Sequence, residues 1–304
     1  MMNWKLLVLA VPACLTLACA HAQKKTEPVT PESVVAPAPV QEEPLAKVAN
    51  AFLQKGEVRL AEENARAALK KDTGDALALL VMARIFILQG KLEAAKIVLQ
   101  DALVNHAGDA MLHLWFGHVL RKMNQKKEAI ASYEKAIALR GDLAEAHENL
   151  GLLLLEEGEI EKAKSALEKG VSLLPKSAIA HLNLGNLFFA QNDLSGAVKE
   201  YREALALDAT LTDAHFNLGL AYLSGPIAGL EELARLQAAK DSFQAFLQSK
   251  ELEPRLKDNV AAYIKSCEQR ILLEQKKQAP APKPEPAATP APTEEGGKSE
   301  QENK

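Results

Sequence analysis

The sequence is poor in the residues and motifs that enzymes use. Its 304 residues include three cysteines, and aromatic residues make up only 5%. It contains no Gly-x-Ser-x-Gly, His-Glu-x-x-His or Cys-x-x-Cys motif, and no glycine-rich loop of the kind that holds phosphate. We therefore expect a protein that is not an enzyme and that binds neither a cofactor nor a metal ion.

An excess of positive charge is also missing. The chain has 36 lysines and arginines against 40 acidic residues, so its formal net charge is −4 at pH 7. Because binding to nucleic-acid phosphates needs clustered cations, we expect no nucleic-acid partner. Apolar residues make up 48% of the chain, which is enough for a sizeable core in a soluble protein.

The N-terminal apolar run is too short to cross a membrane. It extends over 13 residues, from Leu6 to Ala18, whereas a membrane-spanning helix needs about 20. We interpret residues 1–22 as an export signal. Ordinary signal peptidase could cleave after Ala22, whereas "LTLAC" resembles the bacterial lipoprotein box, with Thr16 in place of its usual leucine.

Of these two interpretations we favour the lipoprotein, in which Cys19 is acylated, because Cys19 closes the apolar run directly and a tether follows it. The tether, residues 23–41, is rich in proline, and at about 3.1 Å per residue it could reach roughly 60 Å. Residues 278–304 have a similar composition with few bulky apolar residues, so we expect them to be disordered.

Cysteine usage excludes an internal disulfide in the mature protein. Cys14 lies within the signal, Cys19 is removed or acylated, and Cys267 remains alone. Because a lone exposed thiol is a hazard in an oxidising compartment, we expect Cys267 to be buried.

The middle of the chain repeats every 34 residues. Small residues recur at this step, and glycine or asparagine, which tolerate a left-handed backbone, follows seven residues after most of them. Each row carries two apolar stripes of helical period on either side of that turn, which predicts a helix hairpin. Alanine twelve residues after the small residue, as in Gly117 and Ala129, suggests that the two backbones approach closely there. One hairpin cannot cover its own apolar faces, so neighbouring hairpins must stack. The small residues are Ala49, Ala83, Gly117, Gly151, Gly185 and Gly219, and the turn residues are Gly56, Gly90, Asn124, Gly158 and Asn192.

Rows such as "AHLNLGNLFFAQNDLSGAVKEYREALAL" resemble tetratricopeptide repeats, with glycine at the eighth position and alanine at the twentieth. The resemblance implies an all-α, right-handed superhelical solenoid of six hairpins, closed by a capping helix at residues 254–277. A stripe from Leu256 to Ile271 supplies the sealing face of that helix. The repeats are expected at residues 42–75, 76–109, 110–143, 144–177, 178–211 and 212–253.

The sixth row carries an 8-residue insertion, because its paired alanine is Ala239 rather than residue 231. Loop-forming residues start the insertion, and the leucines after them predict a second helix that begins early and is about two turns longer. It is either an embellishment of a terminal repeat or a ledge for a partner, formed by Gly225, Pro226, Gly229 and Leu233.

Histidine recurs at the fourth position of four rows, at residues 113, 147, 181 and 215. No acidic or cysteine partners at metal-binding spacings accompany these histidines, so we interpret them as packing residues rather than ligands.

The resemblance also places a partner-binding groove along the first helices, at repeat positions two, five, six, nine and twelve. The family's best-known site clamps a carboxylate with lysines and arginine, but positions five and six of the last four rows carry no cation. We therefore expect the groove to take an extended or helical segment of another protein. Its residues in these rows are Leu114, Trp115, His118, Glu148, Asn149, Leu152, Leu155, Leu182, Asn183, Asn186, Phe189, Phe216, Asn217 and Leu220.

These features together predict a protein–protein interaction scaffold of the bacterial cell envelope. We expect an outer-membrane lipoprotein that faces the periplasm, or a soluble periplasmic protein if Cys19 is not acylated. It is similar to lipoproteins of gliding-motility or type IV pilus machines, which assemble other envelope proteins. The alternative is a periplasmic accessory protein that recruits or regulates a cell-wall enzyme. A cytoplasmic adaptor would require that residues 1–22 are not a signal.

Overall fold

A computed structural model describes residues 43–248 and 253–278 of the chain. The expected signal with Cys19, the tether and residues 279–304 of the tail lie outside the described residues. Within the described part, the chain forms six pairs of helices and a thirteenth helix, and its one β-type contact is an isolated bridge between Ile227 and Leu230. The prediction of an all-α repeat protein is therefore confirmed.

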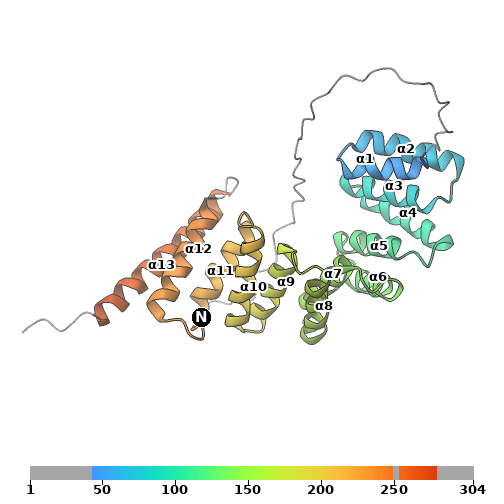
Figure 1. Cartoon of the computed structure of the whole chain (residues 1–304). Coiled ribbons are helices and arrows are strands. Elements are labelled where there is room, and N and C mark those ends of the chain that lie inside the picture. Colours follow the sequence, from blue (N-terminus) through green and yellow to red (C-terminus); the bar gives the residue numbers. More distant parts are fainter. Residues whose placement is uncertain (1–42, 249–252, 279–304) are drawn as a thin grey trace, which may run out of the picture. The chain divides into compact units, whose positions relative to one another are not determined.

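The helices follow one another as antiparallel pairs (Figure 1). The first members of the pairs are α1 (Leu45–Gln54), α3 (Ala76–Leu88), α5 (Ala110–Lys122), α7 (Ala144–Glu156), α9 (Ala178–Ala190) and α11 (Thr212–Ser224). The second members are α2 (Val58–Lys71), α4 (Leu92–Asn105), α6 (Lys126–Leu139), α8 (Ile160–Leu173), α10 (Leu194–Leu207) and α12 (Glu232–Leu247), and α13 (Pro254–Gln278) follows them.

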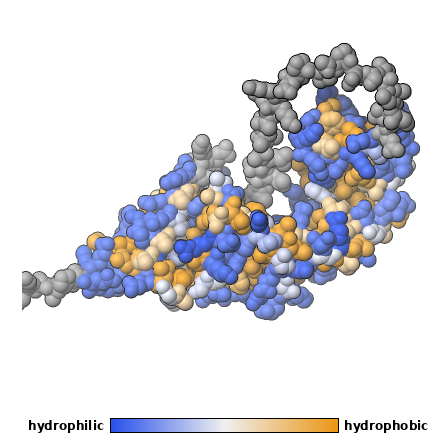
Figure 2. All heavy atoms as spheres, in the orientation of Figure 1, coloured by the Kyte–Doolittle hydropathy of each residue, from blue (hydrophilic) through white to orange (hydrophobic). Residues whose placement is uncertain are grey.

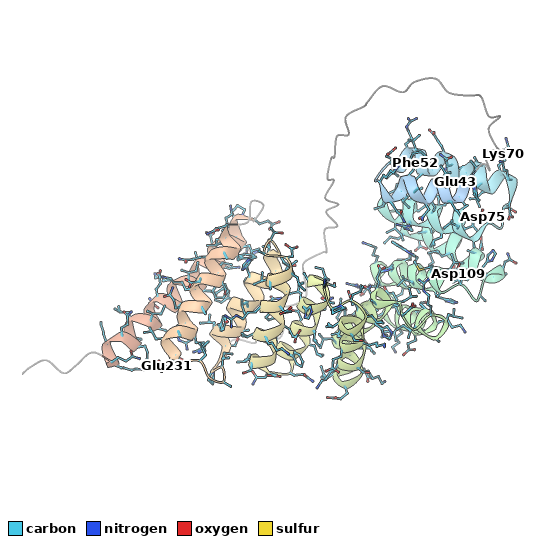
Figure 3. All side chains as sticks on the ribbon, in the orientation of Figure 1. Glu43, Phe52, Lys70, Asp75, Asp109 and Glu231 are labelled. Carbon is cyan, nitrogen blue, oxygen red and sulfur yellow. The ribbon has the colours of Figure 1, made fainter. Side chains whose placement is uncertain are left out.

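Local signals in the sequence set where these helices begin and end. Asp75 and Asp109, both labelled in Figure 3, accept hydrogen bonds from backbone amides in the first turns of α3 and α5. Within the pairs, the left-handed turn residues have positive φ, with 60° at both Asn124 and Asn192. The prediction of a left-handed backbone is also confirmed at Gly56, Gly90 and Gly158.

Stacking of consecutive repeats builds the core. Each second helix packs on its own first helix and on the first helix of the next repeat. First helices also contact one another, as α1 does with α3 and α9 with α11. We call the surface formed by α3, α5, α7, α9 and α11 the first-helix face. It is the surface on which the resemblance places the groove.

Three of the repeated glycines also make room for a large side chain. A Cβ atom on Gly117 would lie 2.6 Å from the ring of Tyr133, sixteen residues later, and one on Gly185 would lie 2.6 Å from Tyr201. At Gly219 the corresponding partner is Phe243, at 2.7 Å. Each ring therefore packs directly over the backbone of the first helix, where any side chain would overlap it.

The four recurring histidines have a structural role. In each case Nε2 lies 3.0–3.1 Å from the backbone carbonyl oxygen six residues earlier, in the turn between two repeats. These contacts join His113 to Ala107, His147 to Gly141, His181 to Pro175 and His215 to Ala209. No group of metal-ligating side chains occurs in the described part of the chain.

Most of the insertion in the sixth repeat forms a loop before α12, and only a small part of it lengthens the helix. α12 has 16 residues, against 14 in α10, so the prediction of two extra turns is wrong. Leu230, which we assigned to the helix, lies in the loop before it. The loop packs on the preceding repeat, since Ala228 N donates to Ser195 Oγ at 3.3 Å.

The predicted ledge residues differ in their exposure. Pro226 and Gly229 are exposed, whereas Gly225 and Leu233 are half-buried. A Cβ atom on Gly225 would lie 2.9 Å from Leu194 Cδ1, because the loop lies close to the start of α10. The exposed part of the proposed ledge is therefore confined to the tip of this loop.

The thirteenth helix seals the last pair. α13 packs on α12, and Val260 and Cys267 are fully buried between them. The Tyr263 ring stacks on Phe243 with 5.3 Å between ring centroids. The expectation that Cys267 is buried is confirmed, and burial raises the pKa of its thiol.

Candidate functional site

The first-helix face is less open than the repeat positions imply. Leu114 is only 1% exposed, so the prediction that it lines a groove is wrong. Leu182 and Leu220 are also buried, and Asn183 is 8% exposed. These side chains point between the helices because their positions are needed to pack one repeat on the next. The other ten predicted residues are half-buried, namely Trp115, His118, Glu148, Asn149, Leu152, Leu155, Asn186, Phe189, Phe216 and Asn217.

Two of the three aligned asparagines bond within the stack. Asn149 accepts from Arg121 Nη1 at 2.5 Å and donates to its own helix at Glu145 O, 2.7 Å away. Asn217 Nδ2 donates to Asn186 Oδ1 at 2.8 Å. Both amides therefore make hydrogen bonds to a side chain of the preceding repeat.

The end of the first-helix face nearest α13 is apolar and aromatic. Phe216 contacts the rings of Phe243, Phe246 and Tyr263, with centroids 5.2–6.3 Å apart. It is therefore part of the packing beneath α13, and Phe189 is the half-buried aromatic residue that remains on the predicted groove of repeat five. Figure 2 shows apolar and polar side chains interspersed on the face that it views.

The other end, formed by α3, α5 and α7, carries a network of charged side chains. Arg84 Nη1 donates to Asn50 Oδ1 at 2.9 Å, and its guanidinium lies 4.7 Å from the centroid of the Trp115 ring. Burial lowers the pKa of Arg84, and the nearby Glu145 partly offsets this. The aromatic face and the amide thus hold a cation on this surface.

His118 links α5 to α6 and α7. Its Nε2 lies 3.1 Å from Glu145 Oε1, and its Nδ1 lies 3.4 Å from the hydroxyl of Tyr133. The adjacent His118 and, more weakly, Arg84 lower the pKa of Glu145 although burial opposes this. Burial raises the pKa of Tyr133 far above its usual value, so this hydroxyl stays protonated.

Glu148 is the carboxyl group of this network that lacks a partner. Its Oε1 is buried and makes no hydrogen bond to any described residue. Burial, and then the charge of Glu145, raise its pKa from 4.5 to about 7. The carboxyl group is therefore divided between its neutral and charged forms near physiological pH. We call Arg84, Trp115, His118, Arg121, Glu145, Glu148 and Asn149 the polar cluster.

Sequence reasoning missed three members of the polar cluster. Glu145, Arg84 and Arg121 occupy positions two, nine and twelve of their rows, which are all positions that face the groove by resemblance. A search for cations at every groove position of every row would have found both arginines. Their contacts with Trp115 and Asn149 lie between repeats and follow only from the stacked structure.

In the described residues, no helix is both long and apolar enough to cross a membrane. The polar cluster brings together two arginines, one unpaired carboxyl group and an aromatic ring on α3, α5 and α7. The half-buried apolar side chains of the predicted groove are those of Leu152, Leu155 and Phe189.

Several solved structures have a fold similar to that of this chain. A tetratricopeptide repeat protein from Parabacteroides merdae superposes with a TM-score of 0.55 at 20% identity, over 77% of this chain and 90% of that one. PilF of Pseudomonas aeruginosa gives 0.52 at 18% identity, over 77% and 96%. The APC/C hetero-tetramer Cut9–Hcn1 gives 0.61 at 16% identity, over 73% and 42%. At these identities the likeness concerns the fold alone.

The sequence itself matches family profiles along most of the paired helices. No curated protein matches the chain in sequence. A profile described as "TPR repeat" matches residues 117–158 and 185–224, and two described as "Tetratricopeptide repeat" match residues 48–110 and 144–177. These matches coincide with the stacked helix pairs and their left-handed turns, and the chain belongs to the tetratricopeptide repeat family.

Proposed function

We propose that this protein is a scaffold of the bacterial cell envelope that binds a segment of another protein on its first-helix face. The observation that carries the proposal is the half-buried surface of α5, α7 and α9. There, Trp115, Leu152 and Phe189 offer apolar contacts beside charged groups that are already held in place. Such a mixture of aromatic anchors and fixed polar groups suits a peptide segment better than a small molecule.

The envelope assignment rests on the sequence outside the described residues. A short apolar run that ends at Cys19, followed by a proline-rich tether, supports an exported protein held to a membrane by lipid. On this basis we place the scaffold in a multiprotein machine of the gliding-motility or type IV pilus kind, where it would hold other envelope proteins together.

Partner capture from native membranes tests the binding surface. Leu152→Ala combined with Phe189→Ala removes apolar side chains from the first-helix face, and partner capture is expected to fall about tenfold or more. The matched control, Lys199→Ala combined with Glu203→Ala, changes two exposed residues of α10 and should capture the partner as the wild type does. Loss of capture in the control alone would place the partner on the second helices instead.

The anchor is tested separately by Cys19→Ala. If Cys19 is acylated, this variant should move from the membrane fraction to the soluble fraction, or accumulate unprocessed. The intact mass of the mature wild-type protein should show cleavage before Cys19 and attached acyl chains. Unchanged membrane association together with cleavage after Ala22 would contradict the lipoprotein proposal.

A further inference from the structure

Glu148 occupies a position that is apolar in every other repeat. The fifth residues of the six rows are Ala46, Leu80, Leu114, Glu148, Leu182 and Phe216. The three leucines are buried in the packing between repeats. A carboxyl group at such a position is unfavourable for folding, because its charged form loses hydration without gaining a partner. Local rules of this kind are often broken at functional sites.

The opposite helix is adapted to this carboxyl group. Gly170 of α8 lies against Glu148, and a Cβ atom on Gly170 would lie 2.9 Å from Glu148 Cγ. The equivalent position in the first three repeats and in the fifth is alanine, at residues 68, 102, 136 and 204. Glycine in the middle of a helix is destabilising relative to alanine by about 1 kcal/mol. The fourth repeat therefore departs from the common pattern at both residues, and each departure accommodates the other.

In the described part of the chain, the cationic side chains near Glu148 already have partners, and none of them pairs with Glu148. Arg84 is held by Asn50 and Trp115, Arg121 is bonded to Asn149, and His118 lies against Glu145. Glu148 has no such partner, and its Oε1 makes no hydrogen bond within the described residues. Glu145 and Glu148 are three residues apart on α7, so both carboxyl groups lie on the same side of that helix.

We propose that Glu148, with Glu145 beside it, receives the lysine or arginine side chain of the segment that binds on the first-helix face. The proposal deepens the proposed function and rests on it. An incoming ammonium or guanidinium group would supply the hydrogen-bond donors that Glu148 lacks and would pair its charge. The Glu148 residue as a whole is half-buried, whereas its Oε1 atom is buried. The bound segment is thus recognised by a basic residue in register with the fourth repeat.

Selection from a phage-displayed library of random peptides tests this specificity. Against the wild-type protein, the enriched peptides should carry lysine or arginine at one fixed position relative to their apolar residues. Against Glu148→Gln, which keeps the shape and removes the charge, that preference should disappear. Glu168→Gln on the exposed side of α8 is the matched control, and its selected peptides should retain the basic residue.

Affinities of one enriched peptide provide a second measurement. Replacing its basic residue by norleucine, or Glu148 by glutamine, should each weaken binding about tenfold or more, and the two changes together should weaken it little further. Peptides that bind the wild type without a basic residue, and equally well to Glu148→Gln, would overturn this inference while leaving the proposed function intact. Failure to enrich any peptide that competes for the first-helix face would contradict the proposed function as well.

Discussion

His181 Nδ1 lies 2.7 Å from Glu200 Oε2, and both side chains are buried between α9 and α10. The other ring nitrogen, Nε2, lies 3.1 Å from the carbonyl oxygen of Pro175. A carbonyl oxygen only accepts hydrogen bonds, so Nε2 is the donor in its contact with Pro175. The fifth repeat therefore adds a buried polar pair to the backbone contact that the third, fourth and sixth repeats also make through histidine.

This pair makes the histidine of the fifth repeat, His181, more important for stability than the histidines of the other repeats. We expect His181→Ala to lower the free energy of unfolding by about 1–3 kcal/mol more than His147→Ala does. Both variants lose the contact with a backbone carbonyl, but only His181→Ala leaves a buried carboxyl group without its partner. Urea denaturation of the two variants measures the difference. Equal losses would show that the pair with Glu200 contributes nothing to stability.

Gly185→Ala should destabilise the protein because the helix backbone there lies directly against Tyr201. The added Cβ atom would lie 2.6 Å from the tyrosine ring, and overpacking of this kind costs about 1–3 kcal/mol. The control is Gly108→Ala, at a turn between repeats where an added Cβ atom meets nothing within 4 Å. Thermal melts should show a lower Tm for the first variant and an unchanged or slightly higher Tm for the second. A similar Tm in both variants would contradict the role assigned to the glycines.

Glu232 fastens the capping helix to the sixth repeat. Its carboxylate contacts Arg235 Nη2 at 2.6 Å and Arg270 Nη2 of α13 at 3.0 Å. Arg235 and, more weakly, Arg270 lower the pKa of Glu232. Arg235 is 2% exposed and also donates to the carbonyl oxygen of Tyr222. A carboxyl group whose pKa is lowered by folding stabilises the fold at pH values above its usual, unfolded pKa. This stabilisation is lost as the pH falls towards the lowered pKa.

We expect Glu232→Ala to speed hydrogen exchange of the backbone amides in residues 254–278, because Arg270 of α13 then loses its charge partner on α12. The neighbouring Glu231, labelled in Figure 3, is exposed and makes no side-chain cap to α12. Glu231→Ala should therefore leave exchange in α13 unchanged. Faster exchange in both variants, or in neither, would contradict the role of Glu232 in holding the cap.

Glu148 should make the stability of the protein depend on pH. Its folded-state pKa is raised to about 7, so the folded protein binds more protons than the unfolded chain between pH 4.5 and 7. Stability should therefore decrease as the pH rises through that window and then level off, by at most about 3 kcal/mol. Glu148→Gln should remove this decrease and raise the stability at pH 8. The comparison is with Glu168→Gln, measured by urea denaturation across the same pH range. A Glu148→Gln profile identical to that of the wild type would contradict the assignment.

The fold could be predicted from the sequence because its signals recur. The turn residues Gly56 and Asn124 take the left-handed backbone that their types favour, and their 34-residue spacing places every hairpin. The burial of Cys267 could be predicted because a lone exposed thiol is a hazard in an oxidising compartment, and the residue lies on the apolar stripe of the capping helix. The start of α12 did not follow from the leucine spacing. In the structure, the buried Arg235 in the first turn of α12 donates to the carbonyl oxygen of Tyr222 across the loop.

The candidate site could be predicted only in part, because its contacts lie between repeats. The repeat positions identified Trp115 and Glu148 but also Leu114, which the stack encloses completely. Position alone does not say whether a side chain points between two helices or away from them. The packing of consecutive repeats decides this, and it brings Arg84 over Trp115 and Arg121 to Asn149.

The central claim is that a partner segment lies along the first-helix face, and site-specific photo-crosslinking in intact cells tests it most directly. A photoreactive amino acid replaces the half-buried Leu152 of α7 in one variant and the exposed Glu168 of α8 in a matched variant. The account predicts a discrete crosslinked partner from position 152, lost when Phe189→Ala is added, and no such product from position 168. A partner that crosslinks from position 168 but not from position 152 would contradict the account.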